Sequence, residues 1–165
     1  VSRTLKNTYN EHTLKHEPSF LRFCWFKDDY PTIIRLENLG GKSILATIKI
    51  GNGNFIEHGK LLSDTTILLT KSNSTKINKL LSKDTDLVNL SNAVICPSEI
   101  YIPNVFFEIS KDSHYNIIVL SECYLHYPPY VRIWKIYKNI NKVLKNMDYL
   151  GIENFSDGNS PKGSK

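Results

Sequence analysis

An amphipathic helix near the end of the chain is the sequence feature that most constrains the fold. Between Pro129 and Gly151, apolar residues recur at steps of three and four, and lysines recur on a different face. Proline suits the first helical position and glycine the position just beyond the last. The sequence therefore predicts a helix over residues 130–151. The pattern alone leaves open whether its apolar face closes the core of this domain or meets a partner.

The body of the chain, residues 19–129, carries the signals of short β-strands. The clearest strand is expected at 43–50, where apolar and polar residues alternate before the hairpin signal Gly51-Asn52-Gly53-Asn54. Further strands are expected at residues 20–26, 32–36, 65–70, 93–96, 100–102, 105–110 and 115–120, with a short helix at 75–82. Residues 1–18 are expected to form an arm or helix, and residues 152–165 a disordered tail.

This order of elements is typical of a small Greek-key barrel of the OB type, because a helix is inserted into a series of short strands. We therefore expect a mainly β fold. An OB-like barrel would span residues 19–129, and the amphipathic helix of residues 130–151 would pack on it. The length of 165 residues is enough for one domain with a buried core.

The positive charge of the chain is concentrated rather than spread. Lys and Arg total 21 against 16 Asp and Glu, a net charge of +5. Residues 19–129 hold 11 basic and 11 acidic residues, whereas residues 130–151 hold five basic residues against Asp148 alone. The charge therefore argues against a nucleic-acid surface spread over the whole body and directs attention to the helix.

No motif of catalysis or metal binding stands out. The phosphate-binding, dinucleotide-binding, zinc-protease and serine-hydrolase motifs are all missing from the sequence. Cys123 and His126 have the spacing of half a zinc site, but on an extended segment they would point to opposite faces. We therefore expect a non-enzymatic protein with neither metal nor cofactor, although a catalytic site built from distant residues stays open.

The composition also bears on the compartment. No apolar run is long enough to span a membrane, so no membrane association is expected. Cys24, Cys96 and Cys123 are odd in number and widely spaced, which favours a reducing compartment over a disulfide framework.

Two sets of residues in and near the helix are candidates for binding. Apolar and aromatic side chains could anchor a protein partner or a second copy, and the candidates are Ile133, Trp134, Tyr137, Ile140 and Leu144. Basic side chains with nearby strand aromatics could hold single-stranded nucleic acid, and the candidates are Lys135, Lys138, Lys142, Lys145, Tyr101 and Tyr115. The neutral body favours the first interpretation.

The strand pattern of residues 88–95, 107–120 and 122–125, with the Ser-Lys-x-x-x-Tyr turn at 110–115, resembles the final strands of a known family. The family comprises the OB-fold domains of budding-yeast telomere-capping proteins: the telomeric single-strand DNA-binding protein and its OB-fold partners. The resemblance implies a nuclear module at the chromosome end, used for dimerisation or subunit assembly. Its alternative use in that family is direct binding of single-stranded telomeric DNA.

A second resemblance gives an alternative α+β fold. Tyr127-Pro128-Pro129-Tyr130, with the Lys-Ile-Tyr of residues 135–137, is similar to the Tyr-Pro-x-x-Pro region of ubiquitin-conjugating folds and their inactive, RWD-like relatives. The chain lacks a His-Pro-Asn triplet and the cysteine that follows it in the active enzymes. The resemblance therefore implies an inactive, partner-binding domain, and it requires an extended Tyr-Pro segment.

Overall fold

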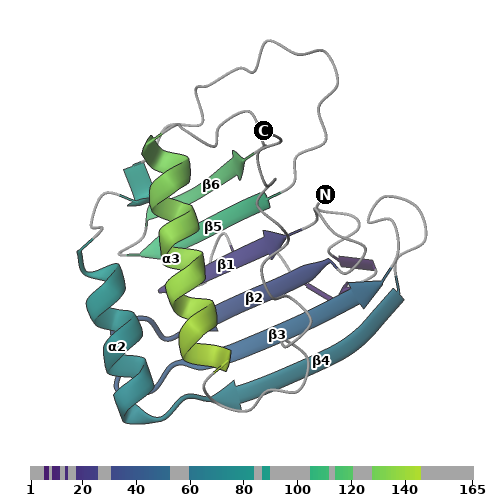
Figure 1. Cartoon of the computed structure of the whole chain (residues 1–165), viewed down its shortest axis with the longest axis horizontal. Helices are drawn as coiled ribbons and strands as arrows, with labels where there is room; N and C mark the ends of the chain where they lie inside the picture. Colours follow the sequence, from purple (N-terminus) through teal and green to yellow (C-terminus); the bar gives the residue numbers. More distant parts are fainter. Residues whose placement is uncertain are drawn as a thin grey trace, which may run out of the picture.

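A six-stranded antiparallel sheet, with two helices against one of its faces, forms the framework of the protein (Figure 1). The strands are β1 (Phe20–Trp25), β2 (Thr32–Glu37), β3 (Leu45–Asn52), β4 (Lys60–Leu68), β5 (Val105–Lys111) and β6 (His114–Leu120). The helices are α2 (Lys71–Leu81) and α3 (Pro128–Lys145), with a short 3-10 helix η1 (Leu87–Asn89). This computed structural model describes residues 6–7, 9–11, 14, 18–25, 31–52, 60–83, 87–89, 105–111, 114–120 and 128–145. The mainly β class with an inserted helix and a long C-terminal helix is confirmed.

The strand order is β4-β3-β2-β1-β5-β6. Strands β1 to β4 follow one another as an antiparallel meander, and the chain then passes through α2 and η1 before β5 returns beside β1. The predicted closure into a barrel is wrong for the strands that the structure describes, because β4 and β6 are the two edges of an open sheet. Other parts of the chain pack on both faces of the central strands, whereas the edge strand β4 is mostly exposed.

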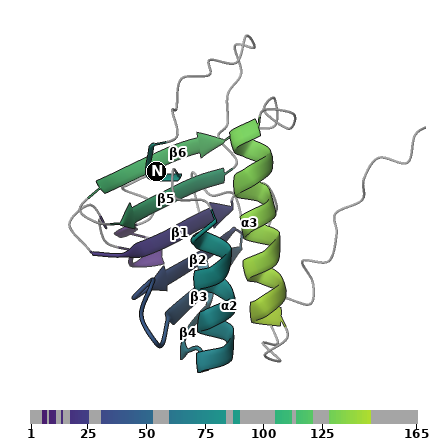
Figure 2. The same cartoon turned by 90° about the vertical axis from the view of Figure 1, so that its left-hand side faces the viewer.

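Helices α2 and α3 lie next to each other in one layer on one face of the sheet (Figure 2). Four side chains of α3 point toward the sheet and are at most 2% exposed: Ile133, Ile136, Ile140 and Leu144. They share a cluster with Ile77 of α2 and with strand residues that include Leu21, Phe23, Ile34, Ala46 and Phe107. The apolar face of α3 therefore closes the core of this domain, which answers the question that the sequence pattern left open.

Local signals at the helix ends explain where the two helices start. Helix α3 begins at Pro128, with Pro129 in its first turn, as expected for residues that lack a backbone N–H. Helix α2 begins at Lys71, earlier than its apolar pattern indicates, because Thr70 caps it: the Thr70 hydroxyl accepts a hydrogen bond from the Asn73 backbone N–H at 3.3 Å. The α+β alternative requires an extended Tyr-Pro segment, whereas the described part of that segment is helical over Pro128–Lys145.

Residues from the start of the chain cover the opposite face of the sheet. Tyr9, Glu11 and Leu14 are at most 2% exposed, and Tyr9 joins a second apolar cluster that also contains Cys24, Ile33 and Phe106. Gly51 in β3 leaves room for this contact, because a Cβ at that position would collide with the Tyr9 ring. These N-terminal residues are therefore an integral layer of the fold.

Beneath this layer lies a buried group of charged side chains, here called the ionic cluster: Glu11, Arg22, Arg35, Lys49 and Glu108. Glu11 bridges three strands, since its carboxylate lies 2.9 Å from Arg22 Nη1, 2.7 Å from Arg35 Nη1 and 3.0 Å from Lys49 Nζ. Glu108 pairs with Arg22 from the other side. A buried charge is stable only when it is paired and hydrogen-bonded, and this cluster satisfies that condition.

Several predicted elements lie outside the described residues. They are the strands at 93–96 and 100–102, the end of the long helix at Gly151, and the tail at 152–165. None of the helices that the structure describes is both long enough and apolar enough to cross a bilayer.

Candidate functional site

The two helices together form a strongly basic surface, here called the basic helical layer. Its members are Lys71, Lys76 and Lys79 of α2 and Arg132, Lys135, Lys138, Lys142 and Lys145 of α3. Neither helix contains an acidic residue. The layer thus carries eight positive charges, and because the net charge of the chain is +5, the remainder of the chain carries −3.

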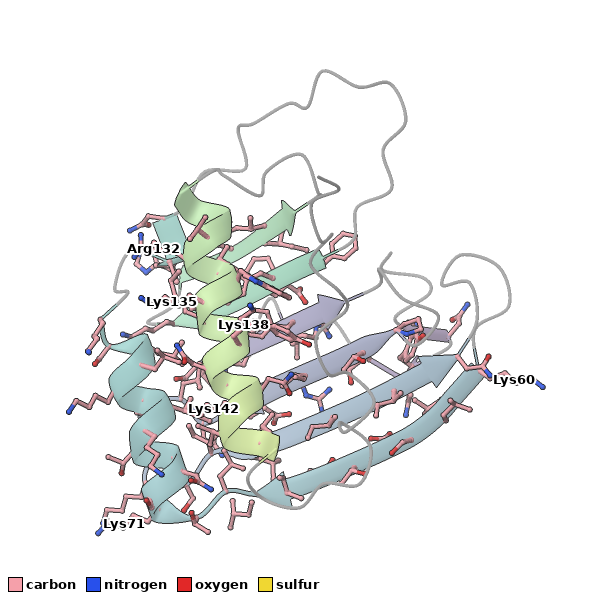
Figure 3. The ribbon with its side chains drawn as sticks, in the orientation of Figure 1. Lys60, Lys71, Arg132, Lys135, Lys138 and Lys142 are labelled. Atoms are coloured by element: carbon pink, nitrogen blue, oxygen red, sulfur yellow. The ribbon has the colours of Figure 1, made fainter. Side chains whose placement is uncertain are left out.

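Six lysines of this layer are exposed to solvent. Lys71, Lys76 and Lys79 are exposed on α2, and Lys135, Lys138 and Lys142 are exposed on α3. Figure 3 shows the labelled basic residues following α3 from Arg132 to Lys142, with Lys71 at the start of α2. Lys60, by contrast, lies at the far end of β4, away from both helices. The charge is therefore gathered on one side of the molecule.

A groove of about 400 Å³ lies where the two helices meet. Four lysines line it, Lys76, Lys79 and Lys83 from the α2 side and Lys142 from α3. Between them the lining consists of Ile77, Leu80, Asn139 and Val143, with no carboxylate. Since four lysines line this groove and its lining holds no acidic residue, the groove favours an anionic ligand.

Aromatic side chains of α3 pack beside the lysines. Trp134 stacks on Tyr137 with ring centroids 5.2 Å apart, and the Lys138 ammonium lies 5.2 Å from the centroid of the Trp134 ring. Tyr137 in turn meets the edge of Phe23 in β1 at 5.4 Å. These contacts hold Trp134 and Tyr137 against the domain and place the Lys138 charge over a ring face, where a cation is attracted.

The structure separates several of the residues that the sequence grouped together. Ile133, Ile140 and Leu144 lie in the core, so they are not surface anchors for a partner, while Trp134 and Tyr137 are only partly buried. Partner binding through α3 stays a prediction that no contact in the structure tests.

Tyr115 does not lie with the lysines. It is on the opposite face of the sheet, where its phenol donates a hydrogen bond to Glu108 Oε1 at 2.6 Å. Burial, together with that hydrogen bond, raises the pKa of Tyr115 above its usual value. Tyr101 lies outside the described residues, and the Lys145 side chain is not described. Tyr115 therefore does not join the α3 lysines in the predicted nucleic-acid site.

Sequence reasoning missed the contribution of α2. In the net charge of residues 19–129, acidic residues elsewhere in the body offset the charges of Lys76, Lys79 and Lys83. That sum hides the absence of any acidic residue between Lys71 and Lys83. A charge count over each expected helix, rather than over the whole domain, would have shown it. The next acidic residue along the chain is Asp84.

The described residues show no other arrangement with obvious chemistry. They contain no group of three His, Cys, Asp or Glu side chains placed to hold a metal ion. A second hollow, of about 200 Å³, lies between α2, η1 and β5 and is lined mainly by apolar and neutral side chains. The basic helical layer is therefore the leading site in the part of the molecule that can be seen.

Comparison with known proteins does not supply a family. No protein-family model matches the chain, and no curated protein matches it significantly. The function must therefore be inferred from the geometry of the site.

Proposed function

We propose that this chain is a non-enzymatic nucleic-acid-binding module that holds the phosphate backbone on its basic helical layer. The observation that carries the proposal is the convergence of two neighbouring helices with eight basic and no acidic residues. A polyanion that crosses both helices would neutralise charges that have no acidic partner within either helix. Release of the counterions that surround nucleic acid then drives binding.

The residue types favour nucleic acid over an acidic protein partner. Stable protein interfaces are depleted in lysine at their centre and rely on buried aromatic and apolar anchors. Here Lys79 and Lys142 line the central groove, and most of the apolar stripe of α3 is committed to the core. Lysine contacts phosphate as a point charge and needs no fixed geometry, which suits a repeating backbone.

The test is a salt titration of binding to a short DNA strand. If the four lysines of the groove each neutralise one phosphate of a single strand, the slope of log affinity against log salt is about −2.8, and affinity falls about fiftyfold between about 50 and 200 mM salt. The double variant Lys79→Gln with Lys142→Gln should reduce that slope by about 1.4, so affinity falls only about sevenfold over the same range.

Lys60→Gln is the control, because it removes one positive charge, half of what the double variant removes, from an exposed lysine far from both helices. It should leave the slope within about 0.5 of the original value. Equal effects of the groove and control variants would contradict the proposal, as would binding that does not respond to salt. Tighter binding of polyglutamate than of DNA would assign the layer to an acidic protein instead.

The resemblance to OB-fold telomere-capping proteins supports more specific proposals, and each of them has a separate test. The return of β5 beside β1 after a helical connection supports an OB-like relationship, although the described sheet is open. A place in a telomere-capping complex implies preference for G-rich strands over other sequences in the same titration. Dimerisation or subunit assembly through Trp134 and Tyr137 implies an association that Trp134→Ala removes, measured by light scattering.

A further inference from the structure

The groove between α2 and α3 combines two chemistries that a bare phosphate contact does not need. Lys76, Lys79, Lys83 and Lys142 supply positive charge around it, while Ile77, Leu80 and Val143 supply an apolar lining between those charges. Asn139 adds an amide that can both donate and accept a hydrogen bond. A ligand that fills this groove therefore has an anionic part and a flat or apolar part joined closely together.

We propose that the groove takes one unpaired nucleotide, with its base on the apolar lining and its flanking phosphates on the lysines. This inference rests on the proposed function and deepens it, because it makes single-stranded nucleic acid the preferred ligand. A volume of about 400 Å³ lies within the range of sites that hold small organic ligands. Duplex DNA keeps its bases stacked inside the helix, so it can reach the lysines but not the lining.

The charge arrangement favours this occupant over other amphiphilic anions. The lysines are not confined to the groove but continue along α3 through Lys138 and Lys135 to Arg132 (Figure 3). A single small anion would leave this continuation unused, whereas a strand with a nucleotide in the groove presents further phosphates to it. The ligand class that matches both the groove and its continuation is a polynucleotide strand.

The experiment compares three ligands of equal length on the full chain. They are an oligothymidylate, an abasic deoxyribose-phosphate strand, and a dA·dT duplex. The first two carry the same phosphates and differ only in the bases. We expect the oligothymidylate to bind at least about fivefold more tightly than the abasic strand, a value at the low end for base contacts because the lining is aliphatic rather than aromatic.

Two variants locate the base contact. Val143→Ser makes the groove lining polar, and Val131→Ser makes the same change at an exposed position of the same helix outside the groove. Val143→Ser should bring the affinity for oligothymidylate down to that for the abasic strand while leaving abasic binding unchanged, and unchanged abasic binding also shows that the variant is folded. Val131→Ser should keep the full difference.

The outcomes separate this inference from the proposed function. Equal, salt-dependent binding of all three ligands would overturn the inference and leave a backbone-binding module. A preference for oligothymidylate that survives Val143→Ser would place the base contact elsewhere and would also overturn it. Binding of none of the three ligands would overturn both proposals.

Discussion

Glu11 holds three strands together, and removing its charge tests how the second face of the sheet is stabilised. Its side chain lies within 3.0 Å of Arg22, Arg35 and Lys49, and the residue is only 2% exposed. The variant Glu11→Gln keeps the shape but removes the one fully buried carboxylate that these cations share, and it leaves Arg35 and Lys49 with only the partly exposed Glu37 and Asp64. Breaking a buried ion pair in this way typically lowers the free energy of unfolding by about 3–5 kcal/mol.

That loss is a large part of the stability of a domain, which is about 5–15 kcal/mol. At about 2–4 °C for each kcal/mol in a chain of this size, the unfolding midpoint should fall by about 6–20 °C. Urea denaturation followed by circular dichroism measures the change. Glu37→Gln is the matched control, because Glu37 contacts Arg35 alone at 2.6 Å and its side chain is 35% exposed, so its removal should lower stability by less than about 1 kcal/mol.

The stabilisation by Glu11 should also depend on pH. Burial on its own would raise the pKa of Glu11, but Arg35, Lys49 and Arg22 outweigh it and hold the pKa below its usual value. The stabilisation is therefore complete above the unfolded pKa of about 4.3 and is lost as the pH falls through the lower folded value. Wild type and Glu11→Gln should converge in stability below that window. A loss under about 1 kcal/mol at neutral pH, or a difference that persists in acid, would refute the argument.

Three further predictions concern packing. Gly51→Ala should lower the free energy of unfolding by about 1–3 kcal/mol, because the added Cβ collides with the Tyr9 ring. The loss should be smaller in a protein that also carries Tyr9→Leu. Equal losses with and without Tyr9→Leu would show that the strain lies elsewhere. Ile140→Ala should lower the free energy of unfolding by about 2–5 kcal/mol, whereas Val131→Ala, at an exposed site, should change it by less than about 0.5 kcal/mol. The Cys24 thiol, whose pKa is raised by burial, should resist alkylation at neutral pH until the protein is unfolded. Peptide mass spectrometry measures that rate, and fast labelling of the folded protein would contradict the assigned burial.

The elements with strong local periodicity could be predicted from the sequence, and the relations between distant segments could not. In the helix after Pro129 apolar residues recur at steps of three and four, and in the strand before Gly51 apolar and polar residues alternate. The structure contains both elements. The closed barrel was predicted from the order of strands and helix alone, and the sequence offers no local sign that Tyr9, Glu11 and Leu14 cover the second face of the sheet. Lys49 in β3 falls on the polar face of that strand, and its contacts with Glu11 and Tyr9 show that this face is buried.

The candidate site was predicted in part for a similar reason. The lysines of α3 are visible because they recur on one strongly patterned helix. Those of α2 are not, because Lys76 and Lys79 become part of one surface with Lys142 only when the two helices pack. The sequence also predicted Ile133 and Ile140 as anchors for a partner, whereas both lie in the core. An apolar stripe on a helix has the same sequence pattern whether it packs on its own sheet or on another molecule.

The ionic cluster also has a consequence for the order of events during folding. Glu11 is synthesised before all of its partners, and the contact between Arg22 and Glu108 joins residues 86 positions apart. Contacts of such long sequence separation form slowly, because the intervening chain must first be ordered. The pairs of Glu11 with Arg22, Arg35 and Lys49 need only the first 49 residues, whereas the pair of Arg22 with Glu108 can form only after β5 has emerged and paired with β1. Until then β1 is an edge strand that carries an incompletely paired charge, which disfavours association with other chains along that edge.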